Sequence, residues 1–245
     1  MTGSIPSTTP VEKSVGTIRT LPRFTVGQRW EHSILLISVT VLLLTGLPQK
    51  YRATTWSQQI LTTPERLYTI QNIHRIAAAV LILVVLYHLG HALYLMSKRR
   101  LSGNMLPSLR DVRDAFQMGR YLLFLTNRKP KFGKYNFEQK FTYWFLFFSI
   151  GIMVVSGFIL WFPIAITRIL PGGIIPSAKL AHSTEAIVTG VFIVIWHFYH
   201  VHLERLNLSI FTGWLNEKDA RTYHPLEFER LTGEPSESRQ TGDDH

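Results

Sequence analysis

Four long apolar stretches constrain this chain more than any other feature of its sequence. They lie at 32–47, 76–96, 141–166 and 180–203. A bilayer core of roughly 30 Å needs about 20 residues of helix to cross it. A chain that faces lipid must also satisfy its own backbone hydrogen bonds, which a helix does within one segment. The sequence therefore predicts an all-α integral membrane protein, a bundle of four spanning helices.

The absence of cysteine and the net positive charge exclude several classes of function. The chain has no cysteine, which excludes disulfides, an iron–sulfur cluster of its own, c-type haem attachment and a thiol nucleophile. Its formal net charge is +10. In a soluble protein such a charge can indicate nucleic-acid binding, but beside four apolar stretches it indicates membrane topology. We expect a lipid bilayer and no nucleic acid among its partners.

The basic residues predict the orientation. Eleven Lys and Arg lie between Lys98 and Lys140 against three acidic residues, and the connections on the other face carry few. The positive-inside rule then places both termini and this basic segment in the cytoplasm, in a bacterial-type inner membrane. We divide the chain into a cytoplasmic segment (1–31), a membrane domain (32–203) and a cytoplasmic tail (204–245). The tail is expected to be mobile or held by a partner, because it has little apolar surface.

The basic segment itself contains an expected helix at 108–125. Its apolar residues fall near helical spacing among charges: Leu109, Val112, Phe116, Leu122 and Leu123. The pattern is typical of an interfacial helix on the membrane surface. A surface helix that packs on a partner subunit is the alternative.

Histidines within or beside the spans are the main candidates for chemistry, because ionisable residues in a bilayer are costly and usually functional. On the second span, His74 and His88 lie about 40° apart around the helix and roughly 21 Å apart along it. On the fourth, His182 and His197 lie about 60° and roughly 22 Å apart. Each span therefore carries one histidine near each membrane surface.

These depths predict two sites with two imidazoles each. The second and fourth helices run in the same direction, so His74 can meet His182 near the outer surface and His88 can meet His197 near the inner one. His32 begins the first span at the inner depth and could replace His88. Two imidazoles saturate a haem iron, which suits electron transfer. The pattern thus indicates two haems between the helices, with Arg75 a candidate partner for a haem propionate.

Several sequence motifs resemble those of a known family. They are RFTVGQRWEH before the first span, Thr45–Gly46 near its end, IHR around His74, GKYNFEQK at 133–140, WHFYHVH around His197, and TGW with YHPLEFE in the tail. In this order and spacing the chain resembles the cytochrome b (gamma) subunit of membrane-bound formate dehydrogenases. Related cytochromes b of thiosulfate reductases and hydrogenases share the pattern.

The resemblance implies two b haems stacked across the membrane and a quinone near the cytoplasmic one. By position, it assigns His74 and His182 to the outer haem, His32 and His197 to the inner haem, and Asn136 to the quinone. The chain departs from the family in carrying His88, in Glu138, and in a fourth-span histidine pair that is one residue wider.

The leading hypothesis is a di-haem membrane anchor subunit of a respiratory oxidoreductase complex. It would carry electrons between a partner redox subunit and quinone, with the primary substrate chemistry on another subunit. Because the chain has no cysteine, that partner would be an iron–sulfur or multihaem c-type protein. The alternative is a histidine-lined transporter of protons or metal ions.

Overall fold

Four long helices form the body of the protein in the computed structural model, which describes residues 20–100, 103–128, 130–203 and 207–236. Three of them are α1 (Val26–Lys50), α3 (Pro64–Ser97) and α5 (Phe137–Trp161). The fourth runs from Ile174 to Val201. All four are long and apolar enough to cross a membrane. The predicted all-α membrane bundle is confirmed.

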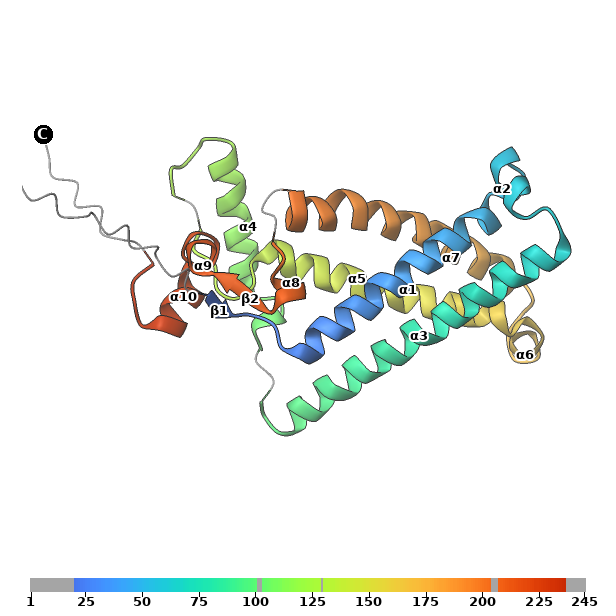
Figure 1. The fold of residues 1–245 in the computed structure, drawn as a ribbon, viewed down its shortest axis with the longest axis horizontal. Coiled ribbons are helices and arrows are strands. Elements are labelled where there is room, and N and C mark those ends of the chain that lie inside the picture. The colour runs from blue at the N-terminus through green and yellow to red at the C-terminus, as the bar shows by residue number, and fades with distance from the viewer. Residues whose placement is uncertain (1–19, 101–102, 129, 204–206, 237–245) are drawn as a thin grey trace, which may run out of the picture.

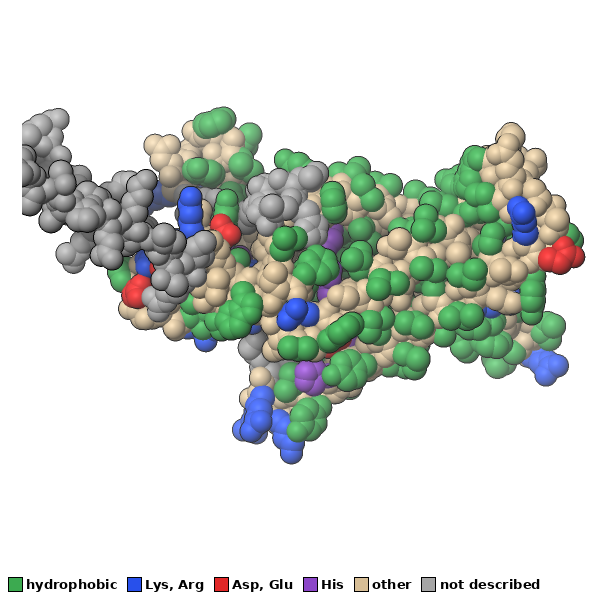
Figure 2. All heavy atoms as spheres, viewed as in Figure 1, with side chains coloured by type: hydrophobic (Ala, Val, Ile, Leu, Met, Phe, Trp, Pro, Cys, Tyr) green, Lys and Arg blue, Asp and Glu red, His purple; other side chains and the backbone are tan. Residues whose placement is uncertain are grey.

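The long helices pack as two antiparallel pairs, α1 with α3 and α5 with the fourth helix (Figure 1). The short helices α2 (Thr55–Ile60) and α6 (Pro163–Thr167) lie at one end of the bundle. Few side chains of the spans are buried against one another, between 6% and 11% of each apolar window. Hydrophobic side chains instead cover the visible face of the bundle, and most Lys and Arg side chains lie towards its ends (Figure 2). This is the surface that a lipid environment requires.

The helices begin earlier than their apolar stretches because polar residues cap them. The side chains of Thr25 and Asn136 accept hydrogen bonds from the third residue of α1 and α5, each in a capping box. Thr63 caps α3, and Pro64 follows as its first residue. As a result, α3 begins twelve residues before the expected 76 and carries His74 well inside the helix.

The fourth helix changes its winding halfway along. Its first part is α7 (Ile174–Phe192), and the continuation η2 (Ile193–Leu203) is a π-helix of 11 residues. π-Helical turns are rare, mostly single, and frequent at functional sites. The segment contains His197, so its geometry bears directly on the candidate site.

Helix α4 (Leu109–Leu122) crosses the end of the bundle, after the short 3-10 turn η1 (Gly103–Met105). The Lys140 ammonium contacts the Asp111 carboxylate at 2.8 Å and ties α4 to α5. Burial would raise the pKa of Asp111, but the hydrogen bonds from Lys140 and Ser108 outweigh it and lower that pKa. Most large apolar side chains of α4 remain exposed, with Leu109 at 90% and Phe116 at 70%, whereas Met118 is buried at 8%. The helix has the form expected of an interfacial helix.

A small cap, formed by both ends of the described chain, covers the same end of the bundle. Strand β1 (Thr20–Pro22) pairs antiparallel with β2 (Trp214–Asn216), which follows α8 (Ser209–Thr212). Helices α9 (Glu217–Tyr223) and α10 (Pro225–Thr232) then pack on the strands. The core of the cap is Leu21, Leu215, Ala220 and Phe228. The tail was expected to be mobile or held by a partner, whereas its described part folds against β1, where its few apolar residues find a core. Residues 204–206 and 237–245 lie outside the described part of the chain.

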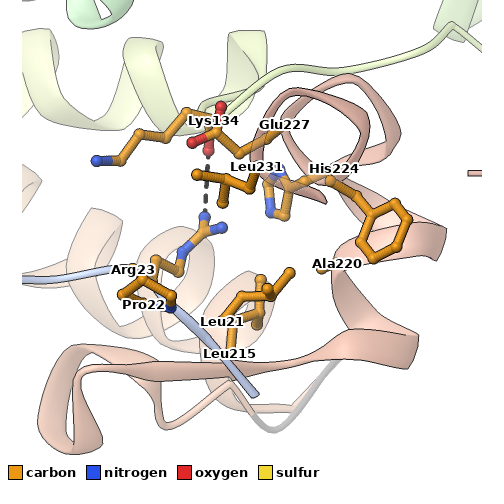
Figure 3. Close-up of a pocket in the computed structure, with 10 residues that line it drawn as sticks. Leu21, Pro22, Arg23, Lys134, Leu215, Ala220, His224, Glu227 and Leu231 are labelled. Atoms are coloured by element: carbon orange, nitrogen blue, oxygen red, sulfur yellow. Dashed lines mark hydrogen bonds between the residues drawn. The ribbon is translucent and has the colours of Figure 1, made fainter. Parts of the chain in front are cut away.

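Polar contacts join this cap to the loop before α5, among them one from the Leu226 backbone amide to the Phe132 carbonyl at 3.2 Å. The Arg23 guanidinium donates to the Lys134 carbonyl at 3.3 Å, drawn as a dashed line in Figure 3. The His224 ring Nδ1 donates to the Gly133 carbonyl at 2.8 Å. Arg23 and His224 are both buried. The start of α5 is thus held by residues from both ends of the chain.

We predict that Phe228→Ala opens the cap while the membrane bundle remains folded. Phe228 is 0% exposed and lies under the Arg221 guanidinium. Its truncation is expected to cost about 3–5 kcal/mol of cap stability. Hydrogen exchange of residues 214–232 measures this opening. Leu231→Ala, at a residue that is 41% exposed, is the control; equal protection in the two variants would contradict the prediction.

Candidate functional site

Two histidines from different helix pairs face each other at the end of the bundle that carries α2 and α6. His74 comes from α3 and His182 from α7. Their ring centroids lie 6.3 Å apart with the planes at 68°. The structure therefore brings together the two residues that were predicted to meet near the outer surface.

Each of these rings contacts a hydroxyl on the neighbouring helix. His74 Nδ1 lies 2.9 Å from Thr45 Oγ1 of α1. His182 Nδ1 lies 3.0 Å from Ser156 Oγ of α5. Both contacts use Nδ1, which leaves Nε2 of each ring as the nitrogen available to a ligand. From the sequence, Thr45 was named only as part of a motif, and Ser156 was not named. The signal for both was a Thr or Ser directly before a glycine within a span.

A second pair of imidazoles lies towards the other end of the bundle. His32 of α1 and His197 of η2 have ring centroids 6.3 Å apart, with the planes at 41°. Phe211 of α8 meets the His32 ring edge-on at 5.8 Å. The spacing of this pair equals that of His74 and His182.

His88 makes its contacts elsewhere. Its Nδ1 lies 2.7 Å from the Glu31 carboxylate and its Nε2 lies 3.1 Å from the Tyr143 hydroxyl. Both ring nitrogens are therefore engaged by protein groups, and His88 links α1 to α5. The structure brings His32 to His197 and gives His88 a bridging role.

The π-helix explains how His197 reaches its place despite the wide histidine spacing. An α-helix would turn His197 about 60° from His182. Winding at about 4.4 residues per turn from Ile193 onward brings it instead to roughly 30° on the other side. A separation one residue shorter in a plain α-helix gives about 40° on that same side. The π-helix therefore absorbs the additional residue.

The remaining predicted residues have other partners. Asn136 is 2% exposed; its carbonyl oxygen accepts from the Gln139 backbone and its amide donates to Glu138 at 3.2 Å. Arg75 is half-buried on the turn beside His74, and its guanidinium lies 3.5 Å from the Asn72 side chain. Asn136 thus caps α5. The contact between Arg75 and Asn72 is long and weak, so the guanidinium could bind another acceptor in its place.

The imidazole pairs fit two axial ligands of one iron. A metal–imidazole bond is about 2 Å, and an imidazole nitrogen lies about 1.1 Å from its ring centre. Two such rings on opposite sides of one ion would have centres roughly 6 Å apart, which both pairs match. Among the described residues, no group of three or more His, Asp and Glu side chains could hold a bare metal ion. The donor set suits a prosthetic group that brings its own equatorial ligands.

The four spanning helices and the facing imidazoles are features expected of a membrane cytochrome. Residues 23–213 match the family model described as prokaryotic cytochrome b561. The chain belongs to this family. It is a membrane cytochrome b of bacterial inner-membrane type, with a role in electron transfer, and its family implies haem b as the cofactor.

Curated relatives agree with this family. The chain is 22% identical over 210 residues to the formate dehydrogenase cytochrome b556(fdo) subunit of Escherichia coli K12. The match covers 84% of this chain and 90% of that subunit. The subunits of the same description from strains O6:H1 (CFT073) and O157:H7 show the same identity and coverage. The predicted resemblance to the formate dehydrogenase gamma subunit is confirmed.

We predict that a protein lacking Val194 still binds haem through His197. The deletion removes the residue that the π-helix absorbs, so the segment can return to α-helical winding with His197 facing nearly the same way. The haem content of the purified protein, compared with that of His197→Ala, measures the outcome. Haem loss as large as that of His197→Ala would contradict this account of the π-helix.

Proposed function

We propose that the chain is the di-haem membrane subunit of a respiratory oxidoreductase, carrying electrons between a partner redox subunit and membrane quinone. The observation that carries the proposal is the repetition of one imidazole spacing at two depths of the bundle. In a plain α-helix, His182 and His197 would lie roughly 22 Å apart along the axis, and the π-helical winding from Ile193 onward shortens this separation only slightly. Two cofactors held at these depths would span most of a bilayer core of roughly 30 Å.

Each of the two proposed haem sites uses its own pair of histidines. His74 and His182 would hold the outer haem, and His32 and His197 the inner one. When bound, a haem b supplies an iron that is reversibly oxidised and reduced by one electron. With one histidine from each helix pair, each site would supply two imidazole ligands, a donor set that suits electron transfer and not the binding of oxygen or a substrate. Arg75 would neutralise a propionate beside the outer site.

The quinone would bind near the inner site, where it can exchange protons with the cytoplasm. Asn136 is placed at this end of the bundle by its role as the cap of α5. Its amide nitrogen donates one of its two N–H groups to Glu138, and a quinone carbonyl could accept the other. Because Asn136 is buried, the neighbouring side chains would have to move to admit the quinone. Glu138 is therefore part of the proposed pocket.

A partner subunit would supply or accept the electrons. The relatives are described as the cytochrome subunit of a formate dehydrogenase, so a multisubunit complex is the natural setting for this chain as well. With no cysteine, the chain offers no thiolate ligand for an iron–sulfur cluster. We propose an iron–sulfur or multihaem c-type partner that also carries the primary substrate chemistry.

Haem stoichiometry and the reduced-minus-oxidised spectrum of the detergent-purified protein test the proposal. We expect two b haems per chain. Replacing His74 or His182 by Ala should remove one haem, and replacing His32 or His197 should remove the other. His88→Ala should retain both, because its ring nitrogens contact Glu31 and Tyr143.

His91→Ala is the matched control, since His91 is exposed and stacks on Tyr87 of its own helix. A folded protein without haem from a haem-sufficient host would overturn the cytochrome assignment of these histidines and favour a histidine-lined transporter. Loss of haem in His88→Ala, with retention in His32→Ala, would show that His88 and not His32 binds the inner haem together with His197.

We further predict that both termini are cytoplasmic. The cap and α4, which belongs to the basic segment between Lys98 and Lys140, lie at one end of the bundle (Figure 1). Cytoplasmic segments of membrane proteins carry the excess of Lys and Arg. A green fluorescent protein fused after residue 245 should fluoresce in intact cells. If alkaline phosphatase fused at the same junction is active and the fluorescent fusion is dark, the C-terminus lies outside the cytoplasm and the predicted orientation is wrong.

A further inference from the structure

We infer that Thr45 and Ser156 are positioning residues that fix the tautomer and orientation of the two outer imidazoles, each together with the glycine that follows it. The inference rests on the proposed function, because it concerns the histidines assigned to the outer haem. It assigns roles to residues that touch those histidines and would not bind the iron themselves.

The direction of the Thr45 hydrogen bond follows from its other partners. Its Oγ1 lies 2.6 Å from the Val41 carbonyl and 3.3 Å from the Leu42 carbonyl. A carbonyl can only accept, so the single hydroxyl proton is directed to the backbone of α1. The hydroxyl oxygen must then accept from His74 Nδ1, at 2.9 Å. Nδ1 therefore carries the proton and Nε2 presents its lone pair.

Ser156 repeats the arrangement on the other helix pair. Its Oγ lies 2.6 Å from the Ile152 carbonyl, one turn earlier in α5, and 3.4 Å from the Met153 carbonyl. Its proton is thus also directed to the backbone, and its oxygen accepts from His182 Nδ1 at 3.0 Å. Both outer histidines are held as the tautomer that leaves Nε2 free, which an axial haem ligand needs.

The glycines bring each ring close to the neighbouring backbone. A Cβ at Gly46 would lie 3.3 Å from His74 Cε1, and a Cβ at Gly157 would lie 3.1 Å from His182 Cε1. Both distances are shorter than ordinary carbon–carbon contact, so an alanine at either position would push the ring away. A hydroxyl and a glycine, adjacent in sequence, therefore hold the Nδ1–Cε1 edge of each ring. The next ring atom, Nε2, is left for the ligand.

The two halves of the site are alike although their surroundings differ. Thr45 and His74 are 29 residues apart, with α2 between their helices, and Ser156 and His182 are 26 apart, with α6 between theirs. The same local solution thus occurs twice in different loop contexts. A contact that served helix packing alone would not need to place the hydroxyl on Nδ1 both times.

A hydrogen bond from Nδ1–H makes an imidazole a more basic ligand, which favours the oxidised iron. We therefore expect Thr45→Val and Ser156→Ala each to raise the midpoint potential of the outer haem and to weaken its retention by about 10- to 100-fold. The inner haem should keep its potential. Thr45→Ser and Ser156→Thr retain the hydroxyl and should restore both properties.

The chain offers matched controls for both variants. Thr40 donates to the Leu36 carbonyl at 2.8 Å on an exposed face of α1, and Ser177 donates to the Gly173 carbonyl at 3.0 Å on α7. Thr40→Val and Ser177→Ala therefore remove the same kind of helix contact without reaching a histidine. Neither should change a potential.

Redox titration and low-temperature electron paramagnetic resonance of the full-length protein in membranes distinguish the outcomes. A shift confined to the outer haem in the Thr45 and Ser156 variants supports the inference. Unchanged potential and signal in both would overturn it, even where haem retention falls. The proposed function fails separately, if the unaltered protein holds no haem or if His74→Ala leaves both haems in place.

Discussion

The need to satisfy both nitrogens of each imidazole inside an apolar bundle governs the rest of this structure. A polar group in hydrocarbon costs several kcal/mol unless it finds a partner. His88 meets this need with Glu31 and Tyr143. His74 and His182 meet half of it with the hydroxyls of Thr45 and Ser156. An iron ligated by Nε2 would satisfy the remainder.

The division of the bundle into two helix pairs gives such a cofactor a structural role. The pairs α1–α3 and α5–α7 are each formed by neighbouring spans, whereas α1 and α7 touch only sparsely. Both imidazole pairs bridge from one helix pair to the other. A ligand that binds only the assembled state stabilises that state, so haem binding would hold the two halves together.

The sequence predicts the spans and the outer histidine pair, because depth along a helix follows from residue number alone. Which of His32 and His88 lies beside His197 could not be predicted in the same way. It depends on which face α3 turns towards α1 and α5, and Glu31 and Tyr143 decide that locally. The orientation of His197 could not be predicted either, because the calculation assumed α-helical winding and a π-helix begins at Ile193. The cap was underestimated because its tail residues acquire a core only against β1.

The pairing of β1 with β2 ties the cap to the order of synthesis. Thr20–Pro22 leaves the ribosome before any span, and Trp214–Asn216 leaves after all four. The cap, with its contacts to the loop at Gly133 and Lys134, can therefore close only on a chain that has been translated through its last membrane helix. A truncated or stalled chain would expose an unpaired strand edge and apolar side chains from its N-terminal segment, features by which quality control can distinguish it from a finished protein.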